Sequence, residues 1–334
     1  FASDRFGRRP VILAGLVVFV LGSAVAALAD HILGVIVGRA LQGGGAIAAA
    51  VMALAADLTA PEQRSKVMAI IGISVGAAFL IAMVVGPVLG GIAGLASLFW
   101  LSAGLGTLAI AVLYGVIPAP AHHGLHSDAE PVASRFGAVL RAPDLLRLDG
   151  GIFVLHFLLT AAFAVLPVML EDHLGLAVAA HWQVYVPVLI LSVVVLFPAL
   201  ALAERRRWHQ GVMAAAVIGL IVAQLGLAAL GHHAGILLAA LWLWFAAFNI
   251  LEATLPALIS RYAPAETKGT AMGVYATAQF AGAFLGGVVG GTVAGAWGSE
   301  WVFLVGILGA LGWLAGIRGM GPVPDTRSRT AAAE

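Results

Sequence analysis

The sequence has no cysteine and few charged residues. Of its 334 residues, 62% are hydrophobic and only 10% are Asp, Glu, Lys or Arg, whereas soluble domains average about 45–50% apolar and about 25% charged residues. The lack of cysteine excludes disulfides, thiolate nucleophiles and Cys-ligated metal sites. So few charges could not cover a soluble protein of this length, which excludes a soluble enzyme, a nucleic-acid-binding protein and a disordered chain. The composition therefore predicts a polytopic membrane protein.

Ten apolar runs are long enough to cross a bilayer as helices. A spanning helix needs about 20 apolar residues, and helices are expected because lipid offers no partner to an unpaired backbone group. The expected spans are 11–29, 32–56, 67–89, 98–117, 150–170, 184–203, 211–230, 236–259, 271–294 and 301–317. The sequence thus predicts an all-α membrane protein with ten transmembrane helices.

The basic residues gather on one side of these spans. If the connections alternate between two sides, all 17 basic residues except Arg39 fall on the first side. The charges on the second side are acidic, and they are Asp30, Glu171, Asp172 and Glu300. Basic residues accumulate in cytoplasmic loops, so we expect the first side, with both visible ends of the chain, to be cytoplasmic.

A long polar connection divides the spans into four and six. The expected organisation is an incomplete N-terminal bundle of four helices at 1–117, a cytoplasmic central loop at 118–148, a six-helix bundle at 149–317 and a cytoplasmic tail at 318–334. A weak similarity between the two halves at a shift of 204 positions favours two parallel repeats of six helices. On that interpretation, the first two helices of the first repeat are missing.

Three short motifs occupy successive parts of the chain. The segment 4–10 reads DRFGRRP, in which Gly7 permits a positive φ and Pro10 suits the start of a helix. GRALQG lies at 38–43, and GPVLGG lies at 86–91. Taken alone, these segments also suit a basic membrane anchor, a hydrogen bond between helices and close helix packing.

In this order and on these spans, the motifs resemble those of the major facilitator superfamily, and of its drug:proton antiporter branch in particular. The resemblance implies the major facilitator fold with helices three to twelve of twelve visible, in a bacterial inner membrane. Segments 46–58, 245–260 and 269–280 are also similar to one inner-membrane transporter of that branch. The implied function is proton-coupled efflux of a drug-like compound or small metabolite by alternating access. An uncoupled facilitator, or an importer of a small metabolite such as a sugar or organic acid, is the alternative function.

Polar side chains inside the spans are the candidates for the transport pathway. Among the expected spans, Arg39 is the one basic residue, and Glu252 is the one acidic residue that lies well inside a span. Asn249 shares the helix face of Glu252, and burial disfavours a charged carboxylate, so Glu252 is a candidate proton carrier. Each of these groups could instead be a structural hydrogen-bonding residue. The expected pathway residues are Arg39, Gln42, His156, Tyr185, Asn249, Glu252, Tyr275 and Gln279.

The remaining expectations follow from the resemblance. The gating residues would be Asp4, Arg5, Gly7, Arg8, Arg9 and Asp57, with Arg8 and Asp57 as an ion pair. The antiporter motif would bring helices close together at Gly86, Pro87, Gly90 and Gly91, and a second small-residue group lies at Gly282, Gly286, Gly287, Gly290 and Gly291. The expected partners are a small-molecule substrate, a proton and the lipid bilayer. We expect a monomer without metal, cofactor or nucleic acid, and a surface loop at His122, His123 and His126.

Overall fold

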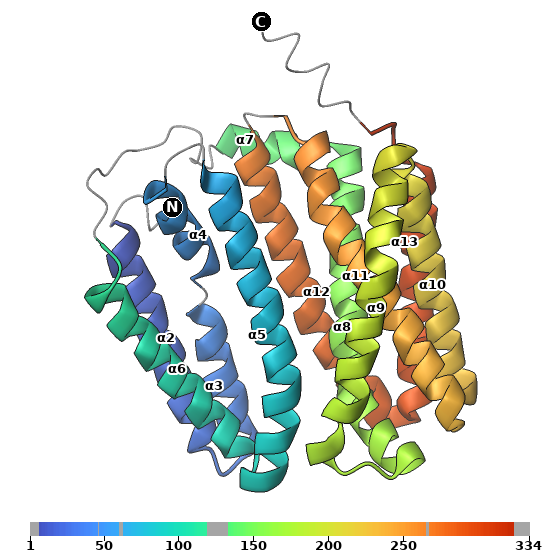
Figure 1. Cartoon of the computed structure of the whole chain (residues 1–334), viewed down its shortest axis with the longest axis horizontal. Helices are drawn as coiled ribbons and strands as arrows, with labels where there is room; N and C mark the ends of the chain where they lie inside the picture. The colour runs from blue at the N-terminus through green and yellow to red at the C-terminus, as the bar shows by residue number, and fades with distance from the viewer. Residues whose placement is uncertain (1–6, 46, 60–62, 119–132, 265–266, 324–334) are drawn as a thin grey trace, which may run out of the picture. The chain divides into compact units, whose positions relative to one another are not determined.

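The computed structural model describes residues 7–45, 47–59, 63–118, 133–264 and 267–323, and the regular elements among them are helices. In chain order they are α2 (Arg8–Ala27), α3 (Ile32–Gly44), α4 (Ala48–Asp57), α5 (Arg64–Ala93), α6 (Leu95–Gly115), α7 (Ala133–Val139), α8 (Pro143–Leu174), the 3-10 helix η3 (Val178–Ala180), α9 (Trp182–Arg205), α10 (His209–Leu230), α11 (Ala234–Tyr262), α12 (Lys268–Trp297) and α13 (Ser299–Arg318). Figure 1 shows α2, α5, α6 and α8 to α13 as long rods. The prediction of an all-helical, multi-span fold is confirmed.

Within the described ranges, nine helices are long and apolar enough to cross a membrane. The difference from the expected ten lies at 32–56, where the chain forms the two shorter helices α3 and α4 in place of one span. Three consecutive glycines, Gly43, Gly44 and Gly45, precede the break, and each costs a helix interior about 1 kcal/mol relative to alanine. A Cβ on Gly45 would lie 2.5 Å from the Gly15 carbonyl oxygen of α2. The glycines therefore weaken the helix where the chain passes close to a neighbour.

The chain divides into two compact units, which we describe separately. Unit 1 comprises residues 1–127 and 177–182. In it α2 packs against α3, α4 and α6, and α5 packs against α6 and η3. A small apolar core joins α2, α4 and α6. Its buried members are Ile12, Leu16, Ala50, Leu54 and Leu113.

Unit 2 comprises residues 128–176 and 183–334. Its most extensive packing is between α8 and α12, and α10 packs against both α11 and α13. A Cβ on Gly282, Gly286 or Gly290 of α12 would collide with the backbone of α8. Small residues four apart thus let these two helices approach closely, as predicted. Among the described residues, no atom lies within 4 Å of a Cβ position on Gly287 or Gly291.

Helix α8 begins earlier than the expected span. It starts at Pro143, the favoured first position of a helix because proline lacks an N–H that would be unpaired there, and it runs for 32 residues. The short helix α7 also forms before it. Asp149, expected at the boundary between loop and bundle, therefore lies in the second turn of a long helix.

Candidate functional site

Three predicted pathway residues meet in unit 2. The His156 Nε2 of α8 lies 2.8 Å from the Gln279 Nε2 of α12 and 3.9 Å from the Glu252 Oε2 of α11. The Glu252 side chain is 39% exposed, yet its Oε2 is buried and has no hydrogen-bond partner among the described residues. We call His156, Glu252 and Gln279 the central polar cluster. It places an acid, an imidazole and an amide from three helices at one point.

Asn249 lies one helical turn from Glu252 but bonds elsewhere. Its Nδ2 donates to the Ser192 Oγ of α9 over 2.7 Å, and the Ser192 hydroxyl donates to the Leu189 carbonyl oxygen over 2.6 Å. Ser192 is fully buried and was absent from the sequence-based set. A serine in an apolar helix does not by itself predict such a bond, since serine hydroxyls often donate to a carbonyl oxygen of their own helix.

The two predicted tyrosines have buried rings. Tyr185 of α9 packs on Phe163, with ring centroids 5.8 Å apart. The Tyr275 hydroxyl of α12 is buried without a hydrogen-bond partner among the described residues. It lies within electrostatic reach of two carboxylates, Glu252 and Asp149. Tyr275 therefore extends the polar region from the central polar cluster along α12.

Asp149 is a residue that the sequence analysis missed. It is 5% exposed, and neither carboxylate oxygen has a hydrogen-bond partner among the described residues. It was left out of the candidate set because the expected span began at the next residue. Its spacing of seven residues from His156 could have revealed it, because seven residues make two helical turns and place both side chains on one face.

In unit 1, the predicted residues of the second span form a short polar chain. The Arg39 Nη1 donates to the Gln42 Oε1 over 2.8 Å, and the Gln42 Nε2 donates to the Ser23 Oγ of α2 over 2.6 Å. The Ser23 hydroxyl then donates to the Phe19 carbonyl oxygen. Arg39 is exposed, whereas Gln42 and Ser23 are buried. The structure pairs Arg39 with Gln42 and adds Ser23, which was not predicted.

The basic motif before the first span joins the ends of three helices. Gly7 has a φ of 88°, the left-handed region that glycine occupies at little cost. The Arg8 Nε lies 3.1 Å from the Asp57 Oδ2 at the end of α4. Arg9 donates to the Leu113 carbonyl oxygen of α6 over 2.7 Å and lies 4.7 Å from the Tyr114 ring centroid. The predicted gating residues Asp4 and Arg5 lie outside the described residues.

The antiporter motif shows close packing at one of its glycines. A Cβ on Gly91 would lie 2.8 Å from the Ala179 Cβ of η3, and one on Gly90 would make an ordinary contact with Leu98. No atom of the described residues lies within 4 Å of such a position on Gly86, so the expected close approach is not found there. Pro87 lies inside α5. The close approach is therefore found at Gly91, which faces η3, while Gly90 makes an ordinary contact with α6.

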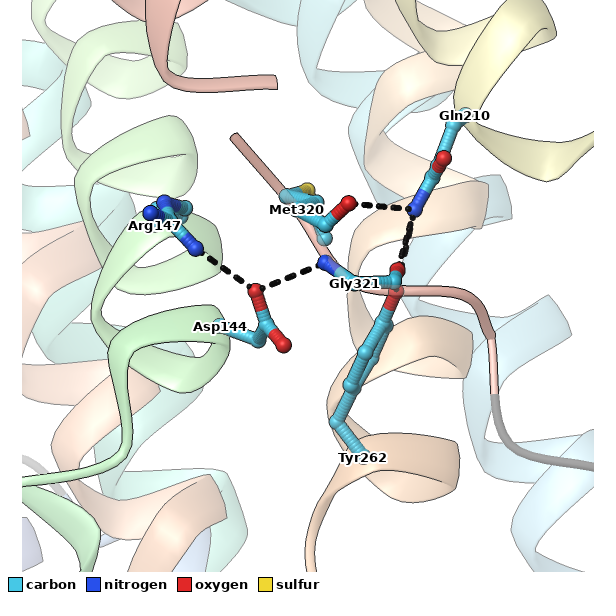
Figure 2. Close-up of polar contacts among 6 residues, drawn as sticks. All are labelled: Asp144, Arg147, Gln210, Tyr262, Met320 and Gly321. Carbon is cyan, nitrogen blue, oxygen red and sulfur yellow. Dashed lines mark hydrogen bonds and ion pairs between the residues drawn. The ribbon is translucent and has the colours of Figure 1, made fainter. Parts of the chain in front are cut away.

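A second polar group closes one end of unit 2, where α8 and α10 begin and α11 and α13 end. Figure 2 shows Asp144 between the Arg147 side chain and the backbone N–H of Gly321, with Gln210 and Tyr262 opposite. The Asp144 Oδ1 accepts from the Arg147 Nη1 over 2.8 Å and from the Gly321 N–H over 3.2 Å. The Gly321 carbonyl oxygen accepts from the Tyr262 hydroxyl over 2.6 Å and from the Gln210 Nε2 over 2.5 Å. We call this group the terminal polar cluster.

The same end of unit 2 carries most of the unit's described arginines, and we call it the basic end. Here the Arg261 Nη2 contacts the Glu204 Oε1 over 2.5 Å, and the Arg261 Nη1 lies 2.9 Å from the His209 Nε2. These side chains line a pocket of about 200 Å³ with Leu200, Ala203, Ala253, Thr254, Ala257 and Leu258. None of the predicted pathway residues lines this pocket.

Metal binding has no support in the part of the chain that the structure describes. No group of three or more His, Asp or Glu side chains there could hold an ion. His122, His123 and His126 lie outside the described residues.

Comparison with known proteins gives consistent matches over most of the chain. The family model for the Major Facilitator Superfamily matches residues 1–287. The chain is 45% identical over 312 residues to the inner membrane transport protein YajR of Escherichia coli strain K12, covering 93% of this chain and 68% of that protein. An uncharacterised transporter of Buchnera aphidicola is 31% identical over 288 residues, with 84% and 72% covered.

Solved structures match the fold at lower identity. A bacterial homologue of the human lysosomal transporter Spinster, in an inward-facing and unoccupied conformation, has a TM-score of 0.71 at 13% identity over 93% of this chain and 83% of that chain. The human organic anion transporter MFSD10 has a TM-score of 0.64 at 22% identity, with 95% and 78% covered. At these identities the likeness concerns the fold alone.

Proposed function

Since the chain belongs to the Major Facilitator Superfamily, we propose that it is a proton-coupled exporter of a drug-like compound or small metabolite. Membership makes it a multi-pass membrane transporter and not an enzyme. The finer assignment to proton-driven efflux in an inner membrane rests on the residues described above. Alternating access of one polar region to the two membrane sides is the mechanism we infer.

The observation that carries the proposal is the environment of Glu252. A carboxylate inside a spanning helix is costly and points to a function by default. Its Oε2 is buried without a hydrogen-bond partner among the described residues and faces His156 across 3.9 Å. A neutral carboxyl group tolerates such a place better than a carboxylate does. Glu252 is therefore suited to carry a proton in one conformation and release it when the region opens to water.

His156 and Gln279 would set the balance between these two states. In the observed orientation the Gln279 Nε2 faces the His156 Nε2. This amide nitrogen can only donate, so His156 accepts there. If His156 became protonated, that bond would be lost, and a charge–charge contact with ionised Glu252 would replace it. The central polar cluster thus offers two mutually exclusive arrangements that differ by one proton.

In unit 1 we propose that the ion pair of Arg8 and Asp57 acts as a gate. The pair joins the start of α2 to the end of α4, so it resists separation of these helix ends. The contact is open to solvent at these helix ends, and ion pairs that are open to solvent typically contribute about 1 kcal/mol or less to stability. It can therefore form and break during a transport cycle without a large barrier.

Transport by purified protein in liposomes would test the proposal. The vesicles would contain a pH-sensitive dye and bear an imposed pH gradient, with ethidium as the probe compound. We expect the wild type to move ethidium against its gradient and to release protons in exchange. Glu252→Gln keeps the shape of the side chain but cannot ionise, so gradient-driven ethidium movement should be lost.

Glu300→Gln is the matched control, because Glu300 is exposed at the start of α13. This variant should transport as the wild type does. Undiminished proton exchange in Glu252→Gln would refute the role of Glu252. If the rate of ethidium movement in the wild type did not depend on the pH gradient, the result would indicate an uncoupled facilitator.

A further inference from the structure

We propose that Asp149 is a second proton-binding carboxyl group, which passes protons between the basic end of unit 2 and Glu252. The inference deepens the proposed function. It rests on that function, because the transferred protons are those that would drive export. Its basis is a set of three groups: the buried carboxyl of Asp149 on α8, the buried hydroxyl of Tyr275 on α12, and Glu252 on α11.

The burial of Asp149 carries the argument. Both carboxylate oxygens are inaccessible and lack a hydrogen-bond partner among the described residues, and the residue is 5% exposed. Removing one partner from a buried ion pair strongly destabilises a protein, because the remaining charge is uncompensated. A permanently ionised Asp149 would destabilise the fold in the same way, whereas a protonated carboxyl group would avoid most of this destabilisation. Packing does not require an acid at this point, since the neighbours Leu148 and Ile152 are buried apolar residues.

The positions along the helices place Asp149 between the surface and the central polar cluster. At a rise of about 1.5 Å per residue, Asp149 lies about 9 Å from the start of α8. On the same scale, Tyr275 lies about 10 Å from the start of α12, Glu252 about 15 Å from the end of α11, and His156 about 20 Å along α8. Titratable groups thus occur at successive depths below the basic end.

The groups around Asp149 are compatible with proton exchange. On its own helix the neighbouring titratable groups are Asp144 and Arg147 toward the surface and His156 toward the interior. Asp144 and Arg147 are bonded to each other over 2.8 Å. From α12 the group in electrostatic reach is Tyr275, which also senses Glu252 of α11. The described charged residues of α13, Glu300 and Arg318, lie at the two ends of that helix. Among the described residues, no cation is bonded to Asp149 that would hold it permanently ionised.

The transfer balances without any further reactant. The Tyr275 hydroxyl is bonded to neither carboxyl group among the described residues, so the transfer requires a movement that brings the three groups into contact. Protonated Asp149 then loses its proton to the Tyr275 oxygen while the Tyr275 hydroxyl gives its own proton to ionised Glu252. The O–H bond of the Asp149 carboxyl breaks, and one forms on the Glu252 carboxyl. The tyrosine ends as it began, and one negative charge has moved from Glu252 to Asp149.

Infrared difference spectra of the purified full chain, recorded across a pH titration, would test this inference without a substrate. A protonated carboxyl group has a carbonyl stretch that is separate from the amide bands. We expect one such band to be lost in Asp149→Asn and a different one in Glu252→Gln. Asp172→Asn is the matched control, because Asp172 is exposed on the same helix. It should leave both bands in place.

Carbodiimide labelling of the wild type gives a second measurement that does not depend on a variant folding. The hydrophobic reagent dicyclohexylcarbodiimide modifies buried protonated carboxyl groups, and mass spectrometry of peptides locates the product. We expect labelling of Asp149 at neutral pH and none of exposed Asp172. Absence of both the band and the label would overturn the inference, even if gradient-driven ethidium transport persisted. Conversely, a titrating and labelled Asp149 in a protein without proton-coupled transport would refute only the proposed function.

Discussion

The close contact between α8 and α12 permits a sharp test with two adjacent glycines. A methyl group on Gly286 would meet the Phe157 carbonyl oxygen and the Thr160 hydroxyl of α8, whereas one on Gly287 has no atom within 4 Å. The Thr160 hydroxyl also donates to the Ala283 carbonyl oxygen over 2.7 Å, which ties the two helices together at this point. Gly286→Ala and Gly287→Ala add the same atom to the same helix, so their difference isolates the contact.

The expected magnitudes have opposite signs. Overpacking a close contact typically costs about 1–3 kcal/mol, while alanine in place of an unconstrained helical glycine gains about 0.5–1 kcal/mol. Both variants gain the alanine term, so it cancels, and the two should differ by the overpacking cost of about 1–3 kcal/mol in the free energy of unfolding. Thermal unfolding in detergent, followed by loss of the monodisperse chromatographic peak, should separate their melting temperatures by several degrees. Equal melting temperatures would refute the reasoning that Gly286 sets the distance between α8 and α12.

Three further predictions concern polar contacts. Reversing the ion pair with Arg8→Asp and Asp57→Arg together should recover most of the stability that either change alone removes. A double-mutant cycle on melting data should give a coupling of about 0.5–1 kcal/mol, and a value near zero would contradict the pairing. Ser23→Ala should cost about 1–3 kcal/mol, because Gln42 keeps a buried amide group without its acceptor; a neutral effect measured by the same unfolding assay would contradict this. Tyr262→Phe should speed amide hydrogen exchange just after α13 by up to about tenfold, since the lost bond is worth about 1 kcal/mol, and unchanged exchange would show that the hydroxyl holds nothing there.

Hydropathy predicted the spans well because lipid imposes the same requirements on every spanning segment. The backbone groups must be hydrogen-bonded within the segment, and the side chains that face lipid must be apolar. The break in the helix within 32–56 has a local cause. Apolar composition registers neither the helix-weakening effect of Gly43, Gly44 and Gly45 nor the close contact of Gly45 with α2. The three glycines in a row were the available signal, and a propensity sum over that span would have found the break.

The candidate site was predictable in its residues but not in its pairings. Glu252, His156 and Gln279 were identified because polar groups inside spans are rare. Their meeting depends on how α8, α11 and α12 pack, which one sequence does not specify. Asp149 was missed for a simpler reason, because a charge at the edge of an apolar run was taken as the boundary of the span. The helix start at Pro143 and the spacing to His156 both indicated that Asp149 lies inside the helix.

The terminal polar cluster offers an experimental handle. Because the backbone of Gly321 is bonded to side chains from α8, α10 and α11, a small fluorophore attached at Val323 would travel with those helix ends instead of tumbling on a loose tether. Its polarisation would then report rearrangements at the basic end in real time, without any label inside the bundle.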